Sequence, residues 1–283
     1  MFLTNFKESY NLLKKNLILL LPDLVSLLIT YSLIAIIFFV TGFSDLMPLI
    51  QSAEDTSFEL LKNFLSENLT SIIISVLIFV IVTFIVGVGV TAIKFDMIND
   101  IINNKKVSLK SSFFKSNKFY WPIVLTRVCI FILFGIFLLL TLLLGGLIYM
   151  MSQNFGSETA TIISLAVMLP IAGLAFLLLK FSLLFVYQIM FLKNIYNPIK
   201  LIQESFLLFK HHTSFVFLSG IFIFALSLVI LGITNLLGQL IGIIPVISEY
   251  LSPVWSIIQM LLSISVSLIS SIYLFLQLKS KKD

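Results

Sequence analysis

Charged residues and cysteines are both scarce in this chain of 283 residues. Lys, Arg, Asp and Glu together make up 11% of the sequence, whereas a soluble domain carries about 25%. The only cysteine is Cys129, which excludes a disulfide bond within the chain. The shortage of charge excludes an ordinary soluble globular domain, and the single cysteine excludes a disulfide-stabilised one.

The sequence also lacks the residue groups that enzymes and metal sites use. His211 and His212 are adjacent, so on a helix they point about 100° apart and cannot share a metal as i, i+4 ligands do. No serine has a neighbouring His and acid to activate it, and no glycine-rich phosphate loop occurs. We therefore expect a protein that is not an enzyme, with no catalytic, metal-binding or cofactor-binding residues and no cofactor.

Apolar residues make up 59% of the chain and gather in long runs. A helix needs about 20 apolar residues to cross a hydrocarbon core of about 30 Å. Six runs reach this length, which predicts an all-α membrane protein with six transmembrane helices in a single polytopic domain, residues 1–283. The predicted spans are Leu17–Val40, Leu69–Ile93, Pro122–Met151, Ala160–Leu192, Ser214–Ile244 and Pro253–Leu278.

Basic residues lie almost entirely on one side of the predicted spans. Of the 18 Lys and Arg residues, 15 lie before the first span, in the second and fourth connections, or after the last span. Only Lys62 lies in the alternate connections, which are acidic. This asymmetry predicts a multi-pass cell-membrane protein with both termini in the cytoplasm. The net charge of +5 is then explained by topology and by membrane lipids as partners, without nucleic acid.

Three short segments share one pattern, in which a serine precedes an aromatic residue just before an apolar run. The serines are Ser9, Ser112 and Ser205, and two predicted spans fit between each serine and the next. We interpret the chain as three hairpin repeats, each opened by a cytoplasmic amphipathic helix that lies flat in the interface. The repeats cover approximately residues 1–93, 94–192 and 193–283, and the interfacial helices residues 2–16, 107–120 and 198–212.

These repeated segments, Glu8-Ser9-Tyr10, Ser111-Ser112-Phe113 and Glu204-Ser205-Phe206, also carry a family resemblance. The chain resembles a broad, uncharacterised group of six-helix integral membrane proteins. That group includes the membrane domain fused to some glycerophosphodiester phosphodiesterases. The resemblance implies a six-span bundle over nearly the whole chain. It implies no catalytic residues, because the residues of the phosphodiesterase part have no counterpart here.

Three ionisable residues fall inside the predicted spans: Asp23, Arg127 and Lys180. Charges in the membrane are costly and usually face the interior of the bundle. Asp23 and Arg127 lie at similar distances after Ser9 and Ser112, so we expect them at one depth and close enough to pair directly or through water. Together with Lys180 they form a candidate intramembrane polar cluster. A structural ion pair, snorkelling side chains and a substrate or proton pathway all remain open.

Several local features carry their own expectations. Pro170 and Gly173 predict a kink in the fourth span. Ser57–Ser66 is expected as a short interfacial helix, while residues 238–252 are either re-entrant or the end of a long fifth helix. The glycines are expected at close helix contacts, and the serines of the last span are expected to bond across helices or to their own helix. These serines are Ser263, Ser265, Ser267, Ser270 and Ser271.

These patterns indicate a class of function and leave the substrate open. The leading hypothesis is a transporter-like or lipid-associated membrane protein. The alternative is a membrane scaffold or regulatory protein that binds a protein partner through its cytoplasmic amphipathic helices. A transporter predicts a polar cavity at membrane depth, whereas a scaffold predicts buried charges and an apolar face for a partner. The oligomeric state is not determined by the sequence.

Overall fold

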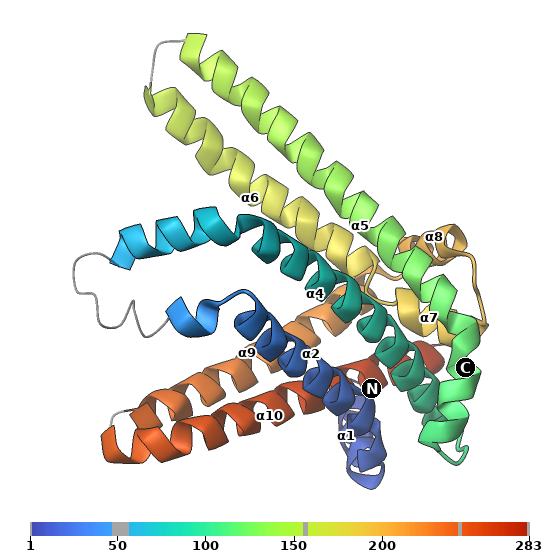
Figure 1. The fold of residues 1–283 in the computed structure, drawn as a ribbon. Coiled ribbons are helices and arrows are strands. Elements are labelled where there is room, and N and C mark those ends of the chain that lie inside the picture. Colours follow the sequence, from blue (N-terminus) through green and yellow to red (C-terminus); the bar gives the residue numbers. More distant parts are fainter. Residues whose placement is uncertain (1, 47–56, 155–157, 243–244, 282–283) are drawn as a thin grey trace.

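The computed structural model describes residues 2–46, 57–154, 158–242 and 245–281 (Figure 1). Helices dominate this part of the chain, and no strand occurs in it. The helices are α1 (Phe2–Lys15), η1 (Leu17–Leu20), α2 (Leu21–Val40), α4 (Ser57–Ile102), α5 (Leu109–Asn154), α6 (Glu158–Ser182), α7 (Val186–Lys193), α8 (Pro198–His211), α9 (Thr213–Gly242) and α10 (Pro245–Lys279).

In the described part of the chain, six helical stretches are long and apolar enough to cross a membrane, in agreement with the predicted number of spans. By length and composition they are Leu17–Val40, Glu59–Ile102, Leu109–Met151, Ala166–Lys193, Thr213–Ile241 and Leu251–Lys279. Their outward faces carry exposed apolar side chains, such as Leu28 and Phe131. Such faces suit hydrocarbon, where an apolar surface carries no hydration cost. The chain is therefore a multi-pass, all-α membrane protein.

Two segments that the sequence predicted as separate short helices are continuous with longer ones. Residues 57–66 form the beginning of α4. Residues 109–120 form the beginning of α5, which continues through Pro122 to Asn154. Ser116 and Asn117 interrupt the apolar stripe of the second segment, so it lacks a face that would hold it flat. The first and third predicted segments do form separate helices, α1 and α8.

The fourth predicted span is divided into two helices at a point that the sequence did not indicate. Helix α6 is continuous through Pro170 and Gly173 and ends at Ser182. Residues 183–185 form a turn, and α7 begins at Val186. In the fifth connection, α9 extends to Gly242 and α10 begins at Pro245. Residues 238–242 and 245–252 are thus helical, in agreement with the long-helix alternative.

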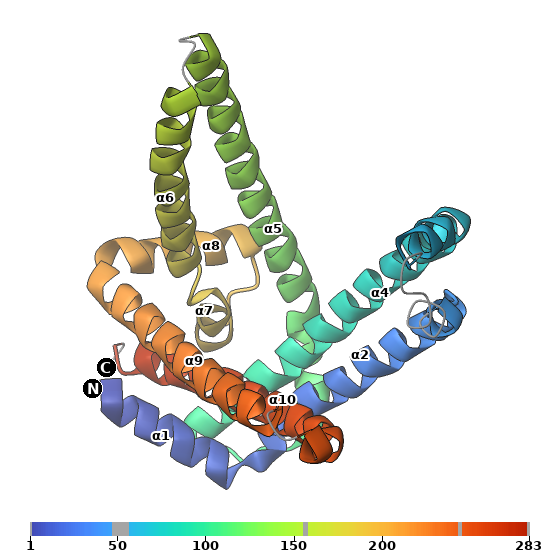
Figure 2. The same ribbon diagram turned by 90° about the vertical axis from the view of Figure 1, so that its left-hand side faces the viewer.

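Three helix hairpins diverge from a common base. The hairpins are α2 with α4, α5 with α6, and α9 with α10, and both views show them spreading apart away from the base (Figures 1 and 2). Helix α1 packs against α10, the beginning of α5 lies beside α4, and α8 packs against α7. The short helices thereby join one hairpin to another at the base.

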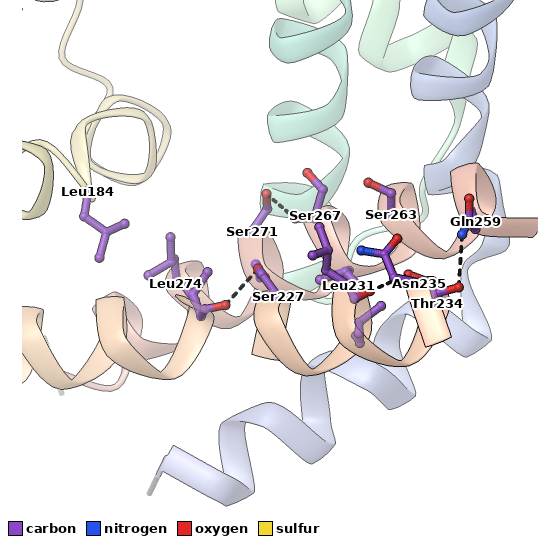
Figure 3. A pocket seen from close by; sticks show the side chains of 14 residues that line it. Leu184, Ser227, Leu231, Thr234, Asn235, Gln259, Ser263, Ser267, Ser271 and Leu274 are labelled. Atoms are coloured by element: carbon purple, nitrogen blue, oxygen red, sulfur yellow. Dashed lines mark hydrogen bonds between the residues drawn. The ribbon is translucent and has the colours of Figure 1, made fainter. Parts of the chain in front are cut away.

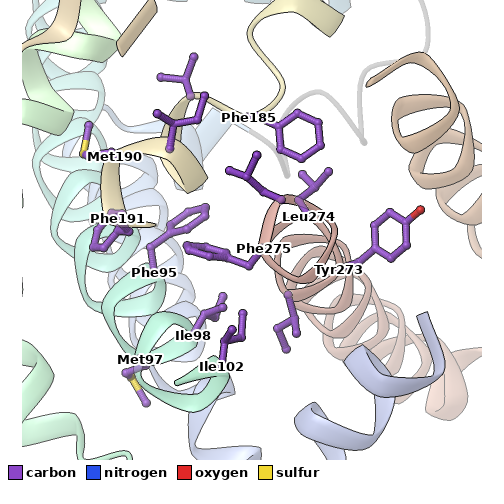
Figure 4. Close-up of a cluster of buried hydrophobic side chains, with 14 of the residues drawn as sticks. Phe95, Met97, Ile98, Ile102, Phe185, Met190, Phe191, Tyr273, Leu274 and Phe275 are labelled. Atoms are coloured by element: carbon purple, nitrogen blue, oxygen red, sulfur yellow. The ribbon is translucent and has the colours of Figure 1, made fainter. Parts of the chain in front are cut away.

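The hydrophobic core lies at this base, where the final turns of α4 and α10 meet α7 (Figure 4). Phe95 of α4 is its aromatic centre. The Phe95 ring centroid is 5.7 Å from those of Tyr187 and Phe191 on α7, and 5.5 Å from that of Phe275 on α10. Offset aromatic pairs at such distances each add about 0.5–1.5 kcal/mol beyond area burial. The base therefore holds the three hairpins together.

Polar contacts reinforce the base. Lys279 at the end of α10 donates from Nζ to the carbonyl oxygen of Ile102, at 2.8 Å, and so satisfies a carbonyl at the end of α4. Both ends of the described chain meet at Phe215 of α9. The Phe2 ring centroid is 6.4 Å from that of Phe215, and Lys281 Nζ is 4.4 Å from the Phe215 centroid. The beginning of α1 and the end of α10 therefore lie on the same side of the molecule.

Candidate functional site

A groove of about 590 Å³ lies between α9 and α10 and has an unusual number of polar side chains for its position within two apolar spans (Figure 3). Apolar residues, among them Leu184, Ile223 and Val266, form the rest of its wall. The polar lining residues that the structure describes are Ser227, Thr234, Asn235, Gln259, Ser263, Ser267, Ser270 and Ser271.

Helical periodicity explains why these residues share one groove. On α10, Gln259, Ser263 and Ser267 repeat every four residues, so they lie on one face of the helix. On α9, Ser227 and Asn235 are two turns apart and face the same space. Figure 3 shows Ser263, Ser267 and Ser271 along α10, with Asn235 and Ser227 on the facing helix α9. Two short polar stripes thus face each other across the hairpin.

Few of the polar groups in the groove bond across it. Gln259 Nε2 donates to the carbonyl oxygen of Thr234 at 3.1 Å and joins α10 to α9. Ser271 donates back to the Ser267 carbonyl within its own helix, as expected for membrane serines. Ser270 Oγ is buried and has no hydrogen-bond partner among the described residues. The groove therefore retains donors and acceptors that a ligand can use.

The groove has no charged lining residue within the described part of the chain. It contains hydroxyl and amide groups, which donate and accept hydrogen bonds without a net charge. Its chemistry is therefore suited to an uncharged polar group. The sequence interpretation noted the serines of α10 but missed Ser227, Thr234, Asn235 and Gln259. The signal for Gln259 was available, because polar residues recur at intervals of three and four in the last span. In the fifth span Thr234 and Asn235 follow Ser227 by seven and eight residues, which is about two helical turns.

The predicted cluster of Asp23, Arg127 and Lys180 is not a single group. Asp23 lies in the first turn of α2, where the positive end of the helix dipole stabilises a carboxylate. Its ion-pair partner is Lys94 of α4, with 3.0 Å between Lys94 Nζ and Asp23 Oδ1. Both side chains are largely buried, at 12% exposure for Lys94 and 17% for Asp23. The predicted direct pair between Asp23 and Arg127 is therefore wrong.

Arg127 instead turns toward the backbone of α4. Its Nη2 donates to the Gly87 carbonyl oxygen at 3.1 Å and to Thr91 Oγ1 at 2.6 Å. A side chain at Gly87 would lie 3.3 Å from Arg127 Nη1, so the glycine makes room for the guanidinium. Lys180 lies on α6, and its side chain is exposed. Helix α4 thus carries the partners of both Asp23 and Arg127, and Lys180 is separate from them.

The described residues contain no group of three or more His, Cys, Asp or Glu that could hold a metal ion. Comparisons of the chain with protein families, with curated proteins and with solved structures gave no match.

Proposed function

We propose that this protein is a lipid-associated, transporter-like membrane protein that binds an uncharged hydroxyl- or amide-bearing group in the groove between α9 and α10. The observation that carries the proposal is the set of facing polar stripes inside two apolar spans. Ligand sites combine mostly apolar walls with a few polar groups that fix orientation, in volumes of about 300–1,000 Å³. The groove, at about 590 Å³, meets this description.

The absence of charge from the described lining favours binding or transport over catalysis. Acid–base and nucleophilic catalysis both need a titratable or activated group next to the substrate. A serine or amide without such a neighbour can only orient a ligand through hydrogen bonds. In the proposed role, the polar part of an amphiphile occupies the groove while its acyl chain remains in the bilayer.

The proposed orientation places the base of the molecule at the cytoplasmic surface. The lysine asymmetry supports it, because positively charged segments are retained inside. In this orientation α1 and α8 lie in the inner interface. Their buried faces carry Ser9 and Ser205, whereas Leu3, Tyr10 and Ile199 are exposed and free to contact lipid. Ser9 and Ser205 precede the first and third hairpins, and Ser112 lies in the first turns of α5 in the second. The three hairpins then correspond to three copies of one unit.

The test compares two probes with the same acyl chain, monoolein, which has two hydroxyl groups, and methyl oleate, which has none. Native mass spectrometry of the purified protein in detergent would measure binding of each. We expect the wild type to prefer monoolein. Replacing Ser263 and Ser267 together by Ala removes two bonding groups and should weaken monoolein binding about tenfold.

The matched control is Ser265→Ala on the same helix. Ser265 donates to the Leu261 carbonyl and does not line the groove, so this variant should bind monoolein as the wild type does. Equal binding of the two probes by the wild type would contradict the proposal. It would favour the alternative, a scaffold that acts through its cytoplasmic helices.

A further inference from the structure

A second cavity, of about 430 Å³, lies beside Arg127 and is separate from the groove between α9 and α10. Arg127 is the one charged residue of its lining within the described part of the chain. Apolar and aromatic side chains form most of the remaining wall: Phe84, Val128, Ile130, Phe131, Phe134 and Tyr187. A guanidinium at the edge of an apolar cavity offers a cation for the head group of an anionic amphiphile and an apolar wall for its chain.

The charge of Arg127 is not neutralised within the described part of the chain. Among the described acids of α2 and of the end of α4, Asp23 pairs with Lys94 and Asp100 pairs with Lys115, and the buried Asp96 forms no ion pair with Arg127. Arg127 forms no ion pair with any described residue, and its two hydrogen bonds go to neutral oxygens of Gly87 and Thr91. A cation at membrane depth without a counter-ion is costly, so an anion that reaches it gains from a strong attraction.

The guanidinium also retains donors for such an anion. Both hydrogen bonds of Arg127 leave from Nη2, whereas arginine has five N–H groups in a planar fork. The fork suits the paired oxygens of a phosphate or a carboxylate. Gly87 and Thr91 hold one arm of the fork against α4, and the Phe84 ring centroid lies 5.9 Å from Arg127 Cζ. The side chain is therefore oriented before any ligand arrives.

The position of Arg127 indicates a lipid and not a soluble anion. Arg127 follows Trp121 by six residues, about 9 Å along the helix. Trp121 is exposed and, as an interfacial aromatic residue, marks the level of the head groups. Phe131 and Val128 line the cavity and are also exposed on the outer surface of the hairpin. An acyl chain that covers these side chains would place its head group beside Arg127.

We infer that Arg127 and the cavity beside it bind the anionic head group of an acyl lipid, with phosphate or carboxylate oxygens on the guanidinium and the chain over Phe131 and Phe134. The site differs from the proposed groove in location and in the charge of its ligand. A negative result for ligand binding at one site would therefore not count against ligand binding at the other.

The test measures lipid binding to the purified protein by native mass spectrometry. One arm compares phosphatidylglycerol with phosphatidylcholine of the same chains, and the other compares oleate with methyl oleate. The wild type should prefer the anionic member of at least one pair, about tenfold for a charge-assisted bond. A preference in the first arm identifies phosphate as the bound group, and one in the second identifies carboxylate. Arg127→Gln should abolish it.

Two further variants separate a binding role from a structural one. Lys180→Gln removes an exposed cation from the neighbouring helix α6 and should retain the wild-type preference. Val128→Trp leaves the charge in place and fills the cavity, so it should also lower binding of the anionic lipid. The inference is overturned if the wild type shows no preference in either arm. It is equally overturned if Lys180→Gln loses as much as Arg127→Gln, or if Val128→Trp binds as the wild type does.

Discussion

Lys94 on α4 donates hydrogen bonds to both carboxylate oxygens of Asp23 on α2, at 3.0 and 3.2 Å. The two residues are 71 positions apart in the chain. The ion pair therefore connects the two helices of the first hairpin near the base. Because both side chains are largely buried, each charge depends on the other for compensation.

The first prediction concerns this pair. Asp23→Asn or Lys94→Met alone should destabilise the protein by about 3 kcal/mol, because each leaves an uncompensated buried charge. The double variant should recover most of that loss. Thermal unfolding of the four proteins in one detergent gives the coupling energy. Lys180→Gln serves as the control for simple loss of charge. Strictly additive effects would show that the two residues do not depend on each other.

A second prediction concerns the contact of Gly220 with Phe181. Gly220 is buried on α9, and a Cβ atom there would overlap the Phe181 ring of α6. Gly220→Ala should therefore lower stability by about 1–3 kcal/mol through overpacking. Gly89→Ala on α4 is the matched control, since its Cβ would meet nothing within 4 Å. Adding Phe181→Leu should restore part of the loss. A Gly220→Ala protein as stable as the wild type would contradict the close packing.

The number of spans was predictable from the sequence because hydropathy reports which segments can be surrounded by lipid. Residues 2–15 and 198–211 were also predictable as separate helices, since their apolar and polar residues alternate with helical spacing. The interruption after Ser182 was not, because the fourth run is apolar on both sides of it. The resemblance to the phosphodiesterase-linked membrane group stays a prediction.

The partners of the membrane charges were not predictable, for a geometric reason. Depth along a helix follows from residue number, but the direction of a side chain depends on how each helix is rotated against its neighbours. Asp23 and Arg127 were expected to pair from depth alone. The sequence did not indicate their actual partners, Lys94 and Thr91, which lie within one turn of each other on α4. Lys94 donates to Asp23, and Thr91 accepts from Arg127.

A third prediction distinguishes two of the repeated serines. Ser205 Oγ donates to the Ser182 carbonyl oxygen at 2.6 Å, and so satisfies the last residue of α6 from a different helix. Ser9 Oγ donates to the Asn5 carbonyl within α1. Ser205→Ala leaves a buried carbonyl without that donor and should cost about 1–3 kcal/mol. Ser9→Ala should cost less. Thermal unfolding of both variants checks the order, and an equal or reversed order would contradict it.

The fourth prediction tests the proposed orientation. After Cys129→Ser, single cysteines would replace Lys14, Glu67 and Ser280, which are all exposed. An impermeant maleimide added to intact cells should label the cysteine at position 67 only, because the lysine-rich side stays in the cytoplasm. Permeabilised cells should give labelling at all three. Labelling of positions 14 and 280 from outside would reverse the orientation, and labelling of only one of them would exclude six spans.

The last prediction concerns Gln277, which is fully buried at the base. Neither of its amide atoms has a hydrogen-bond partner in the described part of the chain, although Tyr273 lies next to it. A buried amide without partners costs stability, and an apolar side chain of similar size removes that cost. Gln277→Met should therefore leave the melting temperature unchanged or raise it.

Gln259→Met on the same helix provides the opposite expectation. Gln259 bonds to the Thr234 carbonyl across the groove, so its loss should lower stability by about 1 kcal/mol. Thermal unfolding of both variants in one detergent compares the two amides directly. A melting temperature that falls more for Gln277→Met than for Gln259→Met would mean that the amide of Gln277 is satisfied in the native protein. Its partner would then be the neighbouring Tyr273 hydroxyl, or a bound water or ligand at the base.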